Sequence, residues 1–221
     1  MKKTLQSKNN QFVILLLLFF CQGLFSQTID KVYVKMPDIL NPILSGKNRL
    51  ELVEYYKSHQ SDSITNRFQN QTHLVLLDEL NRHIVVKNTT STTFDIKILT
   101  LEDSTLAIGI IRTVCAPVCQ STIEFYDTAW NRIQLKFTMP KAIEWVNEKS
   151  IPADKIDIKW VRNMMNVSFI SLKFSSDNQT IKATNNTMEF LSEADRKTIQ
   201  PYILAKPIIL RLKGREWEKM P

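Results

Sequence analysis

The stretch LAIGIIRTVCAPVCQSTIEFYD, residues 106–127, contains two β-rich runs joined by a short loop that follows Cys115 and precedes Cys119. The loop Ala116-Pro117-Val118 has a length that is common in β-hairpins. An antiparallel pair with this loop sets the two cysteines opposite each other. The stretch therefore predicts a hairpin at the centre of an antiparallel sheet, and it predicts no particular chemistry.

The pairing register of this hairpin decides which side chains face each other. With the longer loop, Gly109 lies opposite Phe125, an arrangement in which an aromatic ring covers a strand glycine. A shorter turn with Pro117 at its second position is the alternative. That turn would set the apolar Ile108 against Asp127, so we favour the first register.

The hairpin belongs to a longer series of segments with a period of two, the repeat of a β-strand. Their breaks are short, and parallel pairs need long crossovers, so the strands predict an antiparallel meander. Phe94 and Ile96 alternate with Asp95 and Lys97, which predicts that one face of the sheet is exposed to water. The expected strands span residues 73–79, 82–87, 93–99, 106–114, 120–127 and 132–137.

The flanking segments add helices and further strands. Residues 30–36 alternate and predict an edge strand. Asn48 and Glu51 resemble a capping box that opens a helix over residues 49–58, and residues 61–70 allow a second short helix. Towards the C-terminus we expect a helix over 138–149, a helix rather than a strand within 154–165, strands over 170–174, 179–184 and 208–213, and a helix capped by Ser192.

This order predicts an α+β fold. We expect an antiparallel β-sheet of about seven to nine strands, largely a meander, with N-terminal and C-terminal helices packed on one face or end. A boundary near Thr138 would split the chain, but no linker rich in Gly, Ser or Pro marks it. We therefore predict a single α+β domain over residues 27–221.

Residues 1–26 have the pattern of a signal peptide. A lysine-containing start precedes an apolar run over residues 12–21, which at about ten residues is too short to span a bilayer. Cleavage after Ser26 leaves a chain without a transmembrane segment. Lipid attachment at Cys21 is the alternative, although bulky aromatic residues precede it. We expect export to the periplasm or the outer cell surface.

The charge balance argues against nucleic acid as a partner. The chain has 29 Lys and Arg and 22 Asp and Glu, and loss of the three lysines in residues 1–26 leaves 26 − 22 = +4. The remaining basic residues are interspersed with acids, whereas nucleic-acid binding needs a basic face. The expected partner is an unknown envelope protein, glycan or lipid.

Cys115 and Cys119 are the sharpest candidate for a special role. Thioredoxin-like redox sites use C-x-x-C at a helix N-terminus, whereas these cysteines are four residues apart in a hairpin. Zinc would need two further ligands, and the sequence shows no His or Cys pair at the right spacing. We predict a structural disulfide, with free thiols or a metal or redox role as alternatives.

The remaining candidates favour structural interpretations. His83 would face Asp78 across a predicted hairpin, and we interpret this as a solvated pair because no nucleophile or oxyanion donors are evident. Four glycines in the whole chain do not form a phosphate-binding loop. We therefore expect no catalytic, cofactor-binding or metal-binding residues. Core or partly buried positions, rather than a glycan platform, are expected for Trp130, Trp145, Trp160 and Trp217.

Three motifs resemble an uncharacterised exported family of the Bacteroidota, a domain of unknown function. They are KMPDILNPIL at residues 35–44, NRLELVEYY at 48–56 and IRTVCAPVCQS at 111–121. The resemblance covers the whole chain after residue 26. It implies export and a globular fold, and it adds no catalytic residues because the family has no assigned activity.

These observations favour an exported non-enzymatic scaffold or binding protein of a bacterial envelope. One alternative is a periplasmic carrier of a lipid or another small apolar ligand, which a sizeable cavity would favour. A second is a hydrolase whose site is assembled from distant residues. Perturbed titratable groups gathered in a cleft would favour that activity.

Overall fold

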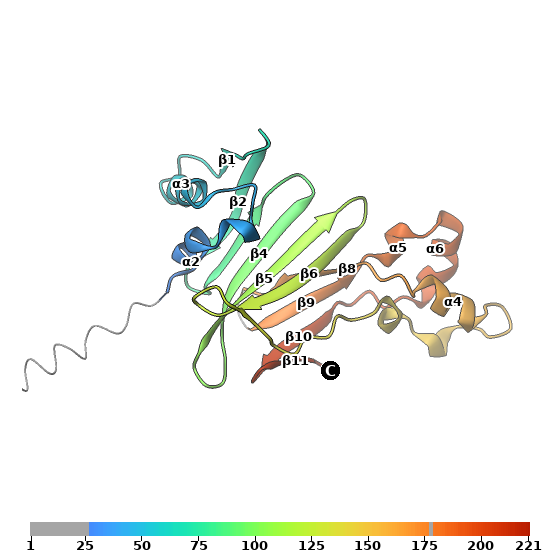
Figure 1. Cartoon of the computed structure of the whole chain (residues 1–221). Helices are drawn as coiled ribbons and strands as arrows, with labels where there is room; N and C mark the ends of the chain where they lie inside the picture. The colour runs from blue at the N-terminus through green and yellow to red at the C-terminus, as the bar shows by residue number, and fades with distance from the viewer. Residues whose placement is uncertain (1–26, 177–178) are drawn as a thin grey trace, which may run out of the picture.

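The computed structural model describes residues 27–176 and 179–221, so the predicted signal peptide lies outside the described residues. Two antiparallel sheets form the body of the protein (Figure 1). Helices near the N-terminus lie beside the larger sheet, and the C-terminal helices gather at one end of the smaller sheet (Figure 1). The predicted α+β fold is confirmed.

The larger sheet is a seven-stranded meander in which every strand pairs with its neighbours in sequence. The predicted strands are present, although the last is shorter than expected. The short helix allowed within residues 61–70 is wrong, because a strand there pairs with β2. The strands are β1 (Ser63–Thr65), β2 (Gln71–Asp78), β3 (His83–Lys87), β4 (Thr92–Thr100), β5 (Leu106–Cys115), β6 (Cys119–Tyr126) and β7 (Arg132–Ile133).

The predicted register of the central hairpin is confirmed, with Cys115 opposite Cys119 and Gly109 opposite Phe125. The closest neighbour of the glycine comes from another part of the chain. A Cβ atom at residue 109 would lie 2.6 Å from Cζ of Phe174, which belongs to the second sheet. Glycine is therefore needed here because another element approaches the strand closely.

The smaller sheet has the order β11-β10-β9-β8, so β8 and β11 are its edges. The predicted strands over residues 170–174, 179–184 and 208–213 are confirmed. A further strand follows a turn at Gly214, whose φ of 61° favours glycine. The strands are β8 (Ile170–Phe174), β9 (Thr180–Asn185), β10 (Ile208–Lys213) and β11 (Glu216–Lys219).

The N-terminal segment is helical, so the edge strand predicted over residues 30–36 is wrong. Its buried side chains recur at the spacing of one helix face, which fits helix α2 (Ile29–Lys35). A 3₁₀ turn, η1 (Asp38–Leu40), leads to helix α3 (Gly46–Lys57). The latter begins earlier than predicted because Ser45, rather than Asn48, is its N-cap. The buried side chains of the first segment are Ile29, Val32, Tyr33 and Met36.

The helix predicted over residues 138–149 is also wrong, because only two 3₁₀ turns form there. Val146 instead makes a β-bridge to Ile203, and the amide of Asn147 donates to the carbonyl of Tyr202 at 2.8 Å. The helix within residues 154–165 and the Ser192 cap are confirmed. The elements are η2 (Ala142–Trp145), η3 (Glu148–Ser150), α4 (Ile158–Met164), α5 (Thr187–Phe190), α6 (Glu193–Ile199) and η4 (Gln200–Tyr202).

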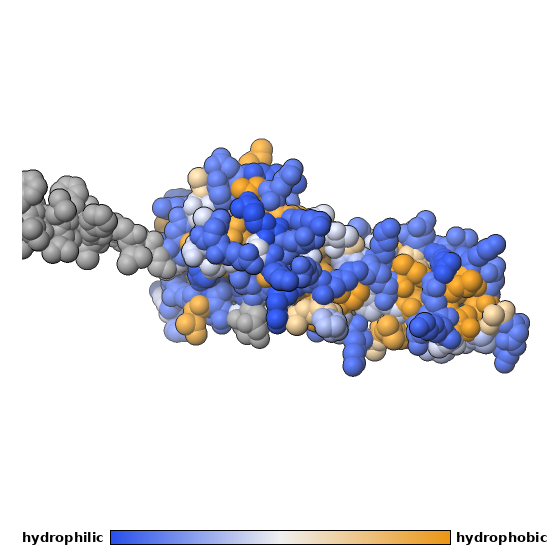
Figure 2. All heavy atoms as spheres, turned by 90° about the horizontal axis from the view of Figure 1, so that it is seen from below, coloured by the Kyte–Doolittle hydropathy of each residue, from blue (hydrophilic) through white to orange (hydrophobic). Residues whose placement is uncertain are grey.

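The two faces of the larger sheet contribute to different cores. One face packs against α2 and α3, and the other packs against the smaller sheet and the C-terminal helices. Seen from below, apolar surface gathers at the end that carries those helices (Figure 2). No helix in residues 27–176 and 179–221 is long and apolar enough to cross a membrane.

Candidate functional site

The second face of the larger sheet is buried where the sequence predicted exposure to water. Asp95 and Lys97 point away from α2 and α3, as the alternation requires. Their exposed fractions are only 5% and 3%, however, because the smaller sheet covers them. The prediction of a wet face is wrong at these positions, and each buried polar group needs a hydrogen-bond partner.

The partners form a row of hydrogen bonds between the two sheets. We call it the polar seam. The polar seam consists of the side chains of Asp95, Lys97, Ser121, Gln179 and Asn186. Each bonds to the backbone of the opposite sheet or of a segment directly attached to that sheet. The seam thus joins strands that are distant in the sequence.

In the middle of the polar seam, side chains of the larger sheet accept hydrogen bonds from backbone amides at the free edge of β8. The amide of Leu172 donates to Ser121 Oγ at 2.9 Å, and the amide of Phe174 donates to Asp95 Oδ2 at 3.0 Å. Edge amides that lack a neighbouring strand are open to pairing with another chain. These two are occupied by side chains instead.

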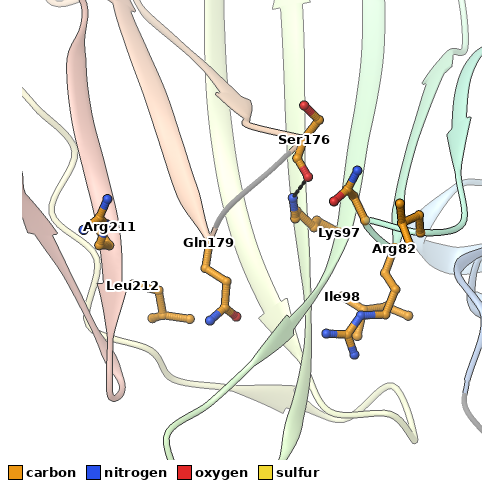
Figure 3. Close-up of a pocket in the computed structure, with 9 residues that line it drawn as sticks. Arg82, Lys97, Ile98, Ser176, Gln179, Arg211 and Leu212 are labelled. Carbon is orange, nitrogen blue, oxygen red and sulfur yellow. Dashed lines mark hydrogen bonds between the residues drawn. The ribbon is translucent and has the colours of Figure 1, made fainter.

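The seam ends in a loop at one side and near the cysteines at the other. Lys97 donates to the carbonyl of Ser176 at 2.9 Å (Figure 3). It also donates to the carbonyl of Ser175. Asn186 Nδ2 donates to the carbonyl of Cys119 at 2.8 Å. The two sheets are therefore tied along the length of β8.

A small hollow of about 350 Å³ adjoins the Lys97 end. Arg82 and Arg211 lie on opposite sides of it (Figure 3). Arg82 Nη2 donates to Thr100 Oγ1 at 2.8 Å.

His83 pairs with Asp95 of the polar seam rather than with Asp78. Asp78 faces His83 in the strand register, but its carboxylate accepts from Asn81. His83 Nε2 instead lies 2.7 Å from Asp95 Oδ1, and only 3% of the residue is exposed. The expected solvated pair is therefore wrong, because the smaller sheet removes the histidine from water.

The His83 ring contacts both Asp95 and Phe174. Phe174 meets it edge-on, with ring centroids 6.4 Å apart and an interplanar angle of 85°. Nδ1 is buried and has no hydrogen-bond partner among the described residues. Asp95 thus uses one carboxylate oxygen for His83 and the other for the backbone of β8.

A groove of about 620 Å³ opens beside the seam. Strands β2 and β3 form one wall and the edge of β8 forms the other. Leu76 and Val85 lie opposite each other in the first wall, and Phe174 lines the second. The exposed lysines Lys87 and Lys173 stand at its rim, one from each sheet.

The groove exists because the smaller sheet ends before it covers the whole larger sheet. Its edge strand β8 packs on β4, β5 and β6, which leaves part of the same face of β2 and β3 uncovered. A register shift between Leu74 and Leu76 leaves Val75 as an extra residue in β2. Val75 lines the groove and is 57% exposed.

The two cysteines also line this groove. The sulfur atoms of Cys115 and Cys119 lie at bonding distance, 1.98 Å, and their Cα atoms are 3.9 Å apart. The sulfur separation fits the predicted disulfide. In residues 27–176 and 179–221, no three His, Cys, Asp or Glu side chains gather as metal ligands. Trp145 and Trp217 are buried in the core, as expected.

Comparison with known proteins gives a fold and a family. A solved structure of a domain of an uncharacterized protein from Porphyromonas gingivalis W83, of the Bacteroidota, superposes with a TM-score of 0.73. The match has 19% sequence identity and covers 87% of this chain and 97% of that chain, so it shows a shared fold. No curated protein matches the chain. A family profile described as "Protein of unknown function (DUF3256)" matches residues 21–217, and the chain belongs to this family.

Proposed function

We propose that the protein is an exported, non-enzymatic binding protein of a bacterial envelope, and that the groove beside the polar seam holds a small ligand with an apolar body. The observation that carries this proposal is the groove itself. Its volume of about 620 Å³ lies within the range of roughly 300–1,000 Å³ that is typical of small-molecule sites. A scaffold has no need of such a groove, so the carrier role is favoured.

The construction of the walls supports a preformed site. Both walls are regular strands, and the seam fixes β8 against the larger sheet through Asp95 and Ser121. Since these side chains already occupy two edge amides of β8, a peptide cannot add there as a further strand. The groove therefore recognises its ligand through side chains such as Val85 and Phe174.

The buried histidine supports binding rather than hydrolysis. A general base must reach the proton that it removes from a substrate. In His83, Nε2 is engaged by Asp95, and Nδ1 is covered and unpartnered among the described residues. The pair therefore positions β8 and presents no nitrogen to the groove.

Export is part of this proposal and has its own test. The sequence pattern of residues 1–26 predicts cleavage after Ser26, and the paired cysteines fit an oxidising compartment. Intact-mass analysis of protein purified from the native envelope should show a chain that begins at Gln27. A chain that retains its lysine-rich start, or a lipidated chain that begins at Cys21, would contradict this.

Binding can be measured with an apolar fluorophore such as N-phenyl-1-naphthylamine. The purified protein should bind it saturably, one molecule per chain. Val85→Trp should abolish binding because the larger ring fills the groove. The matched control is Val167→Trp, since Val167 is 52% exposed and does not line the groove. Absence of saturable binding, or equal binding by the Val85→Trp variant, would refute the proposed site.

A further inference from the structure

We infer that the ligand of the groove is an anionic amphiphile, a molecule with one apolar chain and a carboxylate or phosphate head group. This inference rests on the proposed function and adds the chemistry of the ligand. It is carried by two independent features of the groove: its polarity changes along its length, and the free charges at its rim have one sign.

The change of polarity follows from the strand register. His83, Val85 and Lys87 project from β3 on the groove side, because alternate residues of a strand share a face. Lys87 pairs with Thr93, which in turn pairs with Thr113. The groove is therefore lined by hydroxyl and ammonium groups at the Lys87 end.

The other part of the groove is mainly apolar, and its polar residues His83 and Asp95 are buried and bonded to each other. Val85 lies opposite Leu76, with the bulged Val75 beside them. Phe174 faces them from β8. An extended ligand would thus place its hydrocarbon chain against these residues, and its polar end would lie among the hydroxyls near Lys87.

The charge at the rim selects an anion. Lys87 and Lys173 are exposed, and neither forms an ion pair with another residue of the described chain. Among the described residues, Asp95 is the single acidic residue that lines the groove, and His83 and the backbone of β8 already occupy its oxygens. An anionic head group near Lys87 would gain a charge-assisted hydrogen bond from that ammonium group and would be attracted by that of Lys173, whereas a cationic one would be repelled.

The test compares four ligands with the same ten-carbon chain on the purified full protein. They are decanoate, decyl phosphate, decanol and decylammonium. Calorimetric titration at low salt should show that both anions bind about tenfold or more tightly than decanol, because two lysines contribute. Decylammonium should bind more weakly than decanol. The ratio between the two anions tells which head group the site prefers.

The double variant Lys87→Gln/Lys173→Gln should remove the preference, so that decanoate and decanol bind with similar affinity. The matched control is Lys47→Gln/Lys206→Gln, which removes two exposed lysines that do not line the groove. It should leave the preference unchanged.

The outcomes separate failure of the binding site from failure of the preference for anions. If wild-type protein binds none of the four ligands, the proposed function fails and this inference fails with it. If decanol or decylammonium binds as tightly as the anions, or if the double variant keeps the preference, the groove remains a binding site and the anionic ligand is refuted.

Discussion

The two faces of the seven-stranded sheet are buried by different means. Towards α2 and α3 the face is apolar, and it is closed by side chains such as Ile84, Ile96 and Leu52. Towards the smaller sheet the face carries Asp95 and Lys97, and it is closed by hydrogen bonds in one part and open as a groove in another. The same strands therefore provide a core on one side and a candidate site on the other.

The two kinds of burial have different consequences. Apolar contacts are non-directional, and they stabilise the sheet in proportion to the area removed from water. Hydrogen bonds require particular distances and angles. We therefore assign stability chiefly to the apolar face, and the position of β8, which sets the width of the groove, to the polar seam.

The largest expected effect contrasts one residue from each face. Ile96 is fully buried, so Ile96→Ala should lower the free energy of unfolding by roughly 2–5 kcal/mol. Val85 is partly exposed in the groove, so Val85→Ala should cost about 1 kcal/mol or less. Urea denaturation measures both. Similar losses from the two variants would contradict the assignment of stability to the apolar face.

Removal of the Asp95 carboxylate should have the next largest effect. Asp95→Ala leaves His83 Nε2 and the amide of Phe174 without partners, and each such group costs roughly 1–3 kcal/mol, so a loss of at least about 2 kcal/mol is expected. The control is Asp95→Asn, whose oxygen can still accept from the amide. If Asp95→Ala and Asp95→Asn unfold at the same urea concentration as wild type, the seam contributes nothing to stability.

The close approach of the sheets at Gly109 gives a smaller effect. Gly109→Ala places a methyl group against Phe174 and should cost roughly 1–3 kcal/mol by overpacking. The cost should shrink in a Phe174→Leu background, which lacks the atom that meets the methyl group. A thermal-unfolding double-mutant cycle measures this coupling, and additive losses would show that the two residues do not touch.

The cysteine pair should have the smallest effect. It closes a short ring, for which chain entropy predicts at most about 2 kcal/mol. Cys115→Ser/Cys119→Ser should therefore fold with a modestly lower melting temperature. Mass spectrometry of the exported protein, alkylated without reductant, tests the bond directly. Modification of both cysteines would contradict the disulfide.

The sequence predicts the meander and the hairpin register well because both depend on local patterns. A period of two and short polar breaks allow only antiparallel neighbours, and the loop between Cys115 and Cys119 fixes their pairing. The errors lie where two local patterns compete. Residues 30–36 alternate like a strand, yet Val32 and Met36 are also spaced for one helix face, and packing on the sheet selects the helix.

The candidate site could not be predicted, since it depends on contacts between distant segments. Asp95 and Phe174 are 79 positions apart, and a polar residue on a strand looks the same whether water or a backbone amide is its partner. One signal was present in the sequence. Gly109 in the middle of an otherwise bulky strand indicates that something packs close to it.

The most direct test of the proposed binding site follows amide signals of the ¹⁵N-labelled protein during a titration with decanoate. We predict saturable shifts at groove residues such as Val75, Val85 and Lys173. Leu52 and Ile64, in the core beneath α3, should not shift. Saturable shifts at the α2–α3 face with none in the groove, or no saturable shift anywhere, would contradict the assignment of the binding site to the face that carries the polar seam.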